Sequence, residues 1–174
     1  MIGLATPAAT FETGRLYLRP LEERDAAHFE RLFRDDWDAV KQTGRLPFPT
    51  TAVAMRAWIV RHTGPGGHAF FLRRKPDRDP VGAIGFGGDG PIAEIGYAIG
   101  RIYWGQGYAT EAVGAMIGFA REVGLSGLQA YSFVENPASA KVLEKAGFSE
   151  IGVIVREYPK RGGMRRVHHF KKMF

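Results

Sequence analysis

The sequence contains no cysteine among its 174 residues. Disulfides, thiolate metal sites and cysteine nucleophiles are therefore excluded, and any chemistry must use oxygen and nitrogen groups. No run of about 18 apolar residues is present, so no membrane-spanning helix and no membrane partner is expected. Residues 1–10 lack the charged start and the long apolar stretch of a signal peptide, and we interpret them as a loose leader. These absences predict a cytoplasmic protein.

The length predicts one domain, residues 11–174, large enough to bury roughly 70% of the surface that the unfolded chain exposes. Lys and Arg number 24 against 18 Asp and Glu, which gives a formal net charge of +6. A positive field helps to collect a polyanion. Much of the excess lies between Lys160 and Lys172, where a basic hairpin in solvent is the simpler interpretation. Without an RNA-binding signature, no nucleic-acid partner is expected.

The most informative stretch is YWGQGYATEA, residues 103–112. Before it, residues 93–99 (AEIGYAI) are short and mostly apolar, which predicts a buried strand. After it, apolar residues recur at helical spacing from Val113 to Val123. The two glycines let backbone N–H groups approach a ligand, and the helix start adds unpaired N–H groups and the positive end of the helix dipole. This arrangement predicts a phosphate-binding loop.

Two common phosphate loops are excluded by the residues present. A Walker loop needs a Lys followed by Ser or Thr after its last glycine, and none follows here. A dinucleotide fingerprint needs a third glycine, but Thr110 stands there. It also needs an acidic residue at the end of the next strand, where Leu128 and Gln129 stand.

A second motif, NPASAKVLEKAGF at residues 136–148, follows a candidate strand over residues 128–134. Together the two stretches resemble the GNAT superfamily of N-acetyltransferases, which move an acetyl group from acetyl-CoA to an amine. WGQGYATEA is similar to the pyrophosphate loop of the RimJ/RimL-type branch, although Trp104 stands where the consensus has Gln or Arg. The second stretch is similar to the NxxSxxxxxKxGF signature, and RLYLRP at residues 15–20 is also typical of that branch.

The resemblance implies a single α/β (α+β) domain of the GNAT type over residues 11–174. Its central mixed, mostly antiparallel sheet of about seven strands is splayed in the middle and flanked by about four helices. The residue patterns predict seven matching strands, at 15–19, 68–73, 81–86, 93–99, 128–134, 148–158 and 164–170. They also predict four helices, which follow possible caps at Asp25 and at Thr50 or Thr51, the glycine loop, and Asn136.

The resemblance implies acetyl-CoA as co-substrate, with no metal. The expected cofactor-binding residues are Ala98, Ile99, Trp104, Gly105, Gln106, Gly107, Tyr108, Ala109, Thr110, Asn136 and Ser139. Backbone N–H groups near Ala98 and Ile99 would face the thioester oxygen as oxyanion donors. Asn136 would bond the pantetheine chain, and Ser139 would lie near the sulfur as the catalytic proton donor.

A base is also required, because the amine arrives mostly as ammonium, with a pKa of about 8 for an α-amino group or about 10.4 for Lys. The catalytic candidates are Glu94 and Glu157. In the superfamily, glutamates at the strand position of Glu94 often serve as the base. Some RimJ/RimL-type enzymes draw the base from the closing hairpin, where Glu157 lies. The alternative for Glu94 is a salt bridge to an Arg or Lys.

The acidic stretch Asp35-Asp36-Trp37-Asp38 allows two interpretations. Three carboxylates and an indole can hold a cationic amine, and the family would place this connection beside the substrate entrance. The stretch can equally be a solvated acidic turn.

The sequence thus predicts an acetyl-CoA-dependent N-acetyltransferase that acts on a primary amine, either a protein N-terminus or a small molecule, by direct attack in a ternary complex. The alternative is an inactive GNAT domain that senses acyl-CoA or binds a protein partner. The protein is expected to be a monomer or a homodimer. His168 and His169 face opposite sides of a strand, so they predict no metal site.

Overall fold

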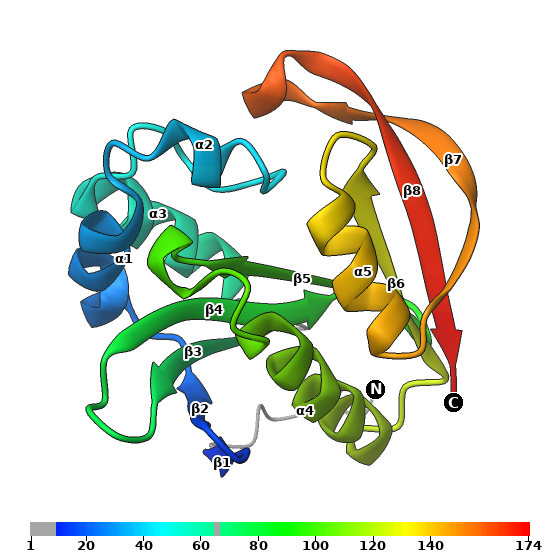
Figure 1. Ribbon diagram of the computed structural model, residues 1–174, viewed down its shortest axis with the longest axis horizontal. Helices are drawn as coiled ribbons and strands as arrows, with labels where there is room; N and C mark the ends of the chain where they lie inside the picture. The colour runs from blue at the N-terminus through cyan, green and yellow to red at the C-terminus, as the bar shows by residue number, and fades with distance from the viewer. Residues whose placement is uncertain (1–9, 65–66) are drawn as a thin grey trace.

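The computed structural model describes residues 10–64 and 67–174, which form one eight-stranded sheet with helices on both faces (Figure 1). The strands are β1 (Phe11–Glu12), β2 (Leu16–Pro20), β3 (His68–Arg74), β4 (Pro80–Gly87), β5 (Ile92–Ile99), β6 (Gly127–Phe133), β7 (Ser149–Tyr158) and β8 (Gly163–Met173). The helices are α1 (Ala26–Phe33), α2 (Trp37–Val40), α3 (Ala52–His62), α4 (Tyr108–Glu122) and α5 (Pro137–Lys145). Three single 3₁₀ turns are η1 (Glu23–Asp25), η2 (Arg101–Tyr103) and η3 (Pro159–Arg161). The loose leader predicted for residues 1–10 lies almost wholly outside the described residues.

The single α/β domain with a mixed sheet is confirmed, and the described residues add one strand and one helix to the prediction. The added strand, β1, has two residues, and the added helix, α2, has four. Both are too short to show a hydrophobic period, so the pattern that located the longer elements could not locate them.

The sheet is split in its middle. Its strands run in the order β1-β2-β3-β4-β5-β6-β8-β7, and every neighbouring pair is antiparallel except β5 and β6. These two run parallel and pair only from Ile92 to Glu94, opposite Gly127 to Gln129. Beyond Glu94, β5 stays with β4 and β6 stays with β8, so the two strands separate (Figure 1). The predicted splay is confirmed.

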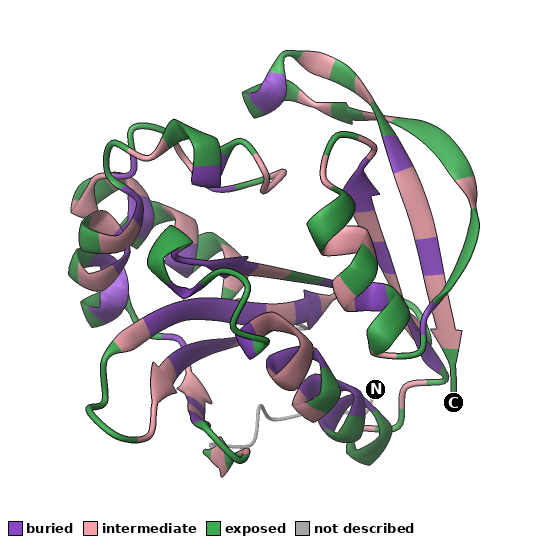
Figure 2. Cartoon of the chain, viewed as in Figure 1, coloured by how far each residue is buried: buried purple, intermediate pink, exposed green. Residues whose placement is uncertain are grey.

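Two apolar cores lie on opposite faces of the sheet. The larger one packs α4 and α5 against it and contains the fully buried Phe70 and Met116. The smaller one packs α1, α2 and α3 against the other face and contains Phe29 and Phe71. Each such side chain contributes about 1.5–3 kcal/mol when it is removed from water. Figure 2 shows burial concentrated in β3, β4 and β5, whereas β7 at the sheet edge is mostly exposed.

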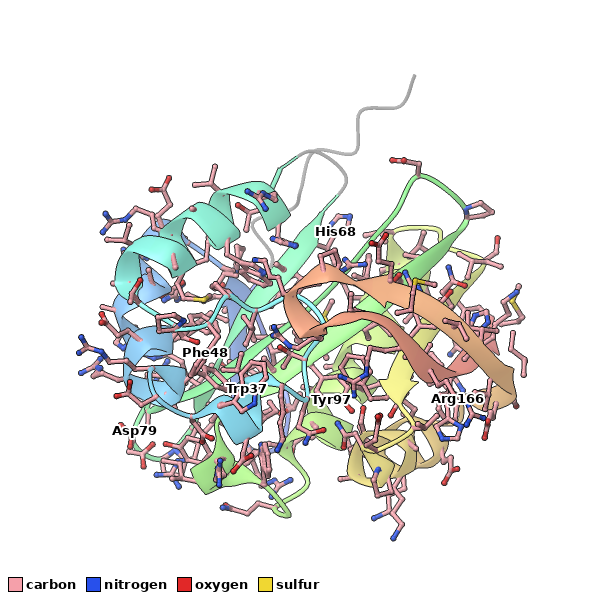
Figure 3. All side chains as sticks on the ribbon, turned by 90° about the horizontal axis from the view of Figure 1, so that it is seen from above. Trp37, Phe48, His68, Asp79, Tyr97 and Arg166 are labelled. Carbon is pink, nitrogen blue, oxygen red and sulfur yellow. The ribbon has the colours of Figure 1, made fainter. Side chains whose placement is uncertain are left out.

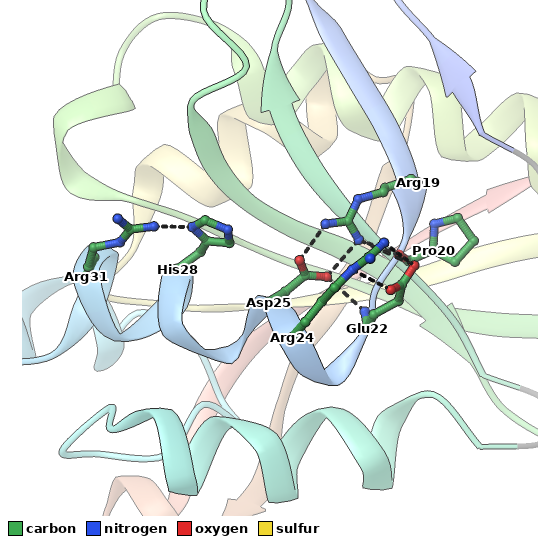
Figure 4. Close-up of polar contacts among 7 residues, drawn as sticks. All are labelled: Arg19, Pro20, Glu22, Arg24, Asp25, His28 and Arg31. Carbon is green, nitrogen blue, oxygen red and sulfur yellow. Dashed lines mark hydrogen bonds and ion pairs between the residues drawn. The ribbon is translucent and has the colours of Figure 1, made fainter.

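The start of α1 differs from the prediction that Asp25 caps it. Asp25 is 1% exposed and makes no side-chain cap to α1. Its carboxylate instead accepts from Arg19 Nη1 (2.8 Å) and from the backbone N–H of Glu22 (2.9 Å), as Figure 4 shows. The second bond is half of a capping box around η1. The buried carboxylate is therefore neutralised by the arginine of β2, and this pair fixes the entry into the helical layer.

Candidate functional site

A cavity of about 230 Å³ opens where β5 and β6 separate. Its walls come from strands β3 to β6, helices α1, α3 and α5, the loop after α2 and the end of β7. Of the residues predicted for the site, it brings together Glu94, Ala98 and Ser139. Figure 3 views this side of the molecule, with Tyr97 labelled.

Ser139 lies in the first turn of α5, where Asn136 holds it. The Asn136 Oδ1 atom accepts from the backbone N–H of Ser139 (3.1 Å), so the predicted cap is confirmed. The Ser139 Oγ atom lies 2.8 Å from the hydroxyl of Tyr97, which comes from β5. Burial raises the pKa of Tyr97 to about 12, although the hydrogen bond with Ser139 opposes the shift. Tyr97 therefore stays protonated at neutral pH and can donate.

Glu94 lies on the cavity wall between two arginines. Its Oε1 accepts from Arg45 Nη2 (2.9 Å), and its Oε2 accepts from Arg156 Nη2 (3.1 Å). Arg45 belongs to the loop after α2, and Arg156 belongs to β7, where its guanidinium lies 3.7 Å from the ring centre of Tyr131. The salt bridge considered as the alternative for Glu94 is therefore present, and it joins both halves of the split sheet.

Glu157 lies away from this cluster. Its neighbours in β7, Arg156 and Tyr158, point toward the cavity, where Arg156 bonds Glu94 and Tyr158 lines the wall. Successive side chains of a strand face opposite sides, so Glu157 faces the other side of β7, and it is exposed. The structure therefore does not bring Glu157 together with Glu94, Ala98 and Ser139 in the cavity.

The glycine loop begins α4 as predicted. Gly107 is the N-cap residue in a left-handed conformation (φ 82°), and no side chain caps the helix. The first-turn N–H groups after Gly107 have no intrahelical acceptor and are available to an anion. Arg15 supports the loop by donating to the Gln106 carbonyl (2.8 Å) and to Glu111 (2.7 Å).

Glu111 is turned away from the helix start by these contacts. Burial favours a higher pKa for Glu111, but hydrogen bonds from Thr13 and Arg15 outweigh it and lower the pKa. The negative charge of the first turn is therefore held by Arg15 and leaves the backbone N–H groups of the loop free for a different anion.

The loop is tied to β5 by Trp104, whose Nε1 donates to the Ile99 carbonyl (2.8 Å). The N–H of Gly100 donates to Val81 on β4 (2.9 Å), so by two-residue alternation the N–H of Ala98 also faces β4. The peptide group of Ile99 faces the gap. Of the two predicted oxyanion donors, only Ile99 therefore presents its N–H there.

The far wall of the cavity consists of the loop from Gln42 to Leu46 and the ring of Tyr158. A Cβ on Gly44 would lie 2.5 Å from Cε1 of this ring, so only glycine allows the close approach. Arg161, 5% exposed, donates to the carbonyls of Thr43 (2.7 Å) and Leu46 (2.8 Å). The C-terminal hairpin thus holds the loop in place.

A histidine also belongs to this wall. The Nδ1 of His62 lies 2.7 Å from the Trp58 carbonyl, and the two rings stack 4.2 Å apart. Burial lowers the pKa of His62, although the contact with Trp58 opposes the shift. The imidazole is therefore neutral at pH 7.

The described contacts of residues 35–38 do not support the hypothesis that this stretch binds an amine, which stays a prediction. Asp36 caps α2 and pairs with Arg101, and Asp38 pairs with Lys41 (2.5 Å). The ring of Trp37 packs against that of Phe48 in a tilted arrangement, with the ring centres 5.1 Å apart (Figure 3). No residue of the stretch lines the cavity described above, which favours the alternative interpretation as an acidic turn.

Sequence reasoning missed Tyr97, Arg45, Arg156 and Arg161. The strand alternation that sets Tyr97 opposite to Glu94 was a usable signal, because the opposite face is the one that α5 covers. The arginines carry no local signal, since their partners lie 49 or more residues away in sequence. In residues 10–64 and 67–174 no group of three His, Cys, Asp or Glu can hold a metal ion, and no helix is long and apolar enough to cross a membrane.

A family model described as an acetyltransferase (GNAT) domain matches residues 15–149. The chain is similar to an uncharacterized N-acetyltransferase, p20, of Bacillus licheniformis, with 30% identity over 161 residues that cover 88% of this chain and 89% of p20.

Two solved structures share the fold. One is the ribosomal-protein-S5-alanine acetyltransferase of Vibrio fischeri, with a TM-score of 0.80 and 19% identity, covering 95% of this chain and 96% of that one. The other is the spermidine N-acetyltransferase of Vibrio cholerae, in complex with CoA and spermine, with a TM-score of 0.77 and 19% identity, covering 92% and 96%. Their names give different acceptors on one fold, so the fold alone does not specify the acceptor.

Proposed function

The chain belongs to the GNAT family of acetyltransferases, and on that premise we propose that it transfers the acetyl group of acetyl-CoA to a primary amine by direct attack in a ternary complex. The observation that carries the proposal is the cavity at the split of the sheet, which Glu94 and the Tyr97–Ser139 pair both line.

The cofactor's phosphates are assigned to the loop that starts α4. Backbone N–H groups from Gln106 to Thr110 bind the pyrophosphate, with Gly105 and Gly107 allowing the close approach and Trp104 fixing the loop to β5. The left-handed Gly107 and the absence of a side-chain cap in this described segment fit that role. Asn136 bonds the pantetheine chain, which enters the gap between β5 and β6.

The thioester oxygen is assigned to the backbone N–H of Ile99, which faces the gap. A donor placed there stabilises the negative charge that forms on this oxygen during attack. Ala98 lines the cavity wall, but its N–H faces β4 and is not assigned to the thioester oxygen.

Two proton transfers complete the reaction. Glu94 receives the ammonium proton, directly or through water, because it is the carboxylate of the cavity wall. Glu157 would act as the base instead only if β7, the edge strand, rotated so that this side chain met the cavity. Ser139, hydrogen-bonded to the protonated Tyr97, gives a proton to the departing thiolate and regains one from the nitrogen, which loses its second proton after the attack.

The RimJ/RimL-type spelling of the loop supports placement in that branch, and a protein N-terminus and a small amine are both acceptors within the proposal. The alternative is a domain that binds acyl-CoA without turnover. CoA release with a panel of amines separates them, with acetyl-CoA binding measured by calorimetry in parallel. Release with at least one amine supports the transferase, whereas binding without release on every amine supports the sensor.

A further inference from the structure

The charges around the cavity are unbalanced. Glu94 is the one carboxylate among the described residues that line it, and two guanidiniums meet on Glu94. Lys160 is a third cation at the same wall, since its Nζ lies 3.5 Å from the Arg45 carbonyl. One carboxylate cannot neutralise these groups, so the wall attracts negative charge.

Both arginines, Arg45 and Arg156, have N–H donors that do not contact Glu94. A guanidinium has five N–H donors, and each of Arg45 and Arg156 uses one nitrogen on Glu94. The Nη1 atom of Arg156 is buried and has no hydrogen-bond partner among the described residues. The indole Nε1 of Trp58, a cavity-lining residue, is buried and unpartnered in the same part of the chain.

Leaving buried donors of this kind without a partner is unfavourable, and more so when the donor is charged. Trp58 lines the cavity, and Arg156 bonds the carboxylate of Glu94 on the cavity wall. A ligand that supplies oxygen acceptors removes that cost, and an anionic oxygen gains more than a neutral one because charge-assisted hydrogen bonds are stronger.

We propose that the acceptor is a small amine that also carries an anionic group, a carboxylate or a phosphate, bound by Arg45 and Arg156 while its ammonium group faces Glu94. This inference rests on the proposed function and names the substrate class of the same site. A polyamine is the wrong partner, because its further cations would meet the two guanidiniums and Lys160. The charge of the wall therefore separates this chain's acceptor from spermidine.

The test compares acceptors in matched pairs by CoA release. The pairs are 4-aminobutyrate with 4-aminobutyramide, for the carboxylate, and phosphoethanolamine with ethanolamine, for the phosphate; spermidine is the polycation. We expect kcat/KM to be at least about tenfold higher for one anionic member than for its neutral twin, with spermidine the poorest. Arg45→Gln should bring that ratio close to one, and Arg45→Glu should favour the neutral twin and spermidine. Arg34→Gln, which removes an exposed ion pair with Glu30 far from Glu94, is the matched control and should keep the wild-type ratio.

Equal or better turnover of the neutral twins by the wild type would overturn the inference and leave the transferase intact. So would an anion preference that survives in Arg45→Gln and in Arg156→Gln. Calorimetry in the presence of CoA covers the case in which no acceptor turns over. Binding of an anionic twin that Arg45→Gln abolishes would then support the inference while the proposed function fails. No binding of any anionic amine would overturn both.

Discussion

The hydroxyls of Tyr97 and Ser139 lie 2.8 Å apart, one from β5 and one from α5, across the open part of the sheet. If this pair protonates the thiolate, it acts only in the transition state. Ser139→Ala should then lower kcat, by about 10²-fold, with little change in the KM for acetyl-CoA. Tyr97→Phe should act in the same direction, and the double variant should lose less than the product of the two effects. An unchanged kcat in Ser139→Ala would leave the residue a role in helix packing alone.

Gly107 should be essential for cofactor affinity. Its φ of 82° strains any branched residue by about 1–2 kcal/mol, and a Cβ there would lie 3.2 Å from Arg15 Nη2. Gly107→Val should weaken CoA binding in calorimetry, because its side chain stands beside the N–H groups of the loop. Gly114→Ala, in the same helix with open space around the new Cβ, is the control and should bind as the wild type does. A folded Gly107→Val with unchanged affinity would refute the loop assignment.

Glu94→Gln distinguishes the two candidate bases. It should retain acetyl-CoA binding, lose about 10²-fold in turnover at neutral pH and regain part of it at high pH, where more of the amine is already neutral. Glu157→Gln should keep the wild-type pH–rate profile, because its side chain faces away from the cavity. The opposite pair of profiles would transfer the role to Glu157.

The burial of His68 predicts how the free energy of unfolding depends on pH. Burial between Phe86 and Phe119 lowers the pKa of His68 below its ordinary 6.5, so under about pH 6.5 the unfolded chain binds a proton that the folded chain resists. Stability is therefore complete above pH 6.5 and falls as the pH falls. Urea denaturation from pH 7.5 to 5.0 should show this loss, and His68→Phe should make it smaller. An identical loss in both proteins would show that other groups cause it.

Arg161→Met should change the KM for the amine more than the KM for acetyl-CoA. It leaves buried carbonyls of the loop from Val40 to Leu46 without their donor, which should cost roughly 2–4 kcal/mol of unfolding free energy. The loosened wall should raise the KM for the amine and leave the KM for acetyl-CoA near the wild-type value. Arg34→Gln, which removes an exposed ion pair with Glu30, is the control for both measurements. Equal changes in both KM values would show a general loss of structure instead.

Local patterns predicted most of the fold, because the residues that decide it are neighbours in sequence. The strand from Ala93, the glycine loop and the Asn136 cap each depend on fewer than a dozen consecutive positions, and all three are present. Asp25 was misread for the opposite reason. Its sequence position fits a helix cap, but Arg19 folds back onto it and takes the carboxylate.

The arginine contacts of Glu94 could not be predicted in the same way. Arg45 and Arg156 reach Glu94 across 49 and 62 residues, and nothing near either arginine in sequence indicates that contact. Ala98 and Ile99 looked equivalent as donors until the pairing with β4 fixed which peptide group faces the gap.

The contacts of Arg161 determine when the cavity wall can form during synthesis of the chain. Its bonds to Val40, Thr43 and Leu46 span 121, 118 and 115 residues, so the loop is synthesised long before the side chain that fixes it. At about 5–20 residues per second, the loop waits roughly 6–24 s on the ribosome for its partner. Contacts of such long range also form late in folding, after the local ones. The wall of the cavity is therefore completed only after the closing hairpin has been synthesised.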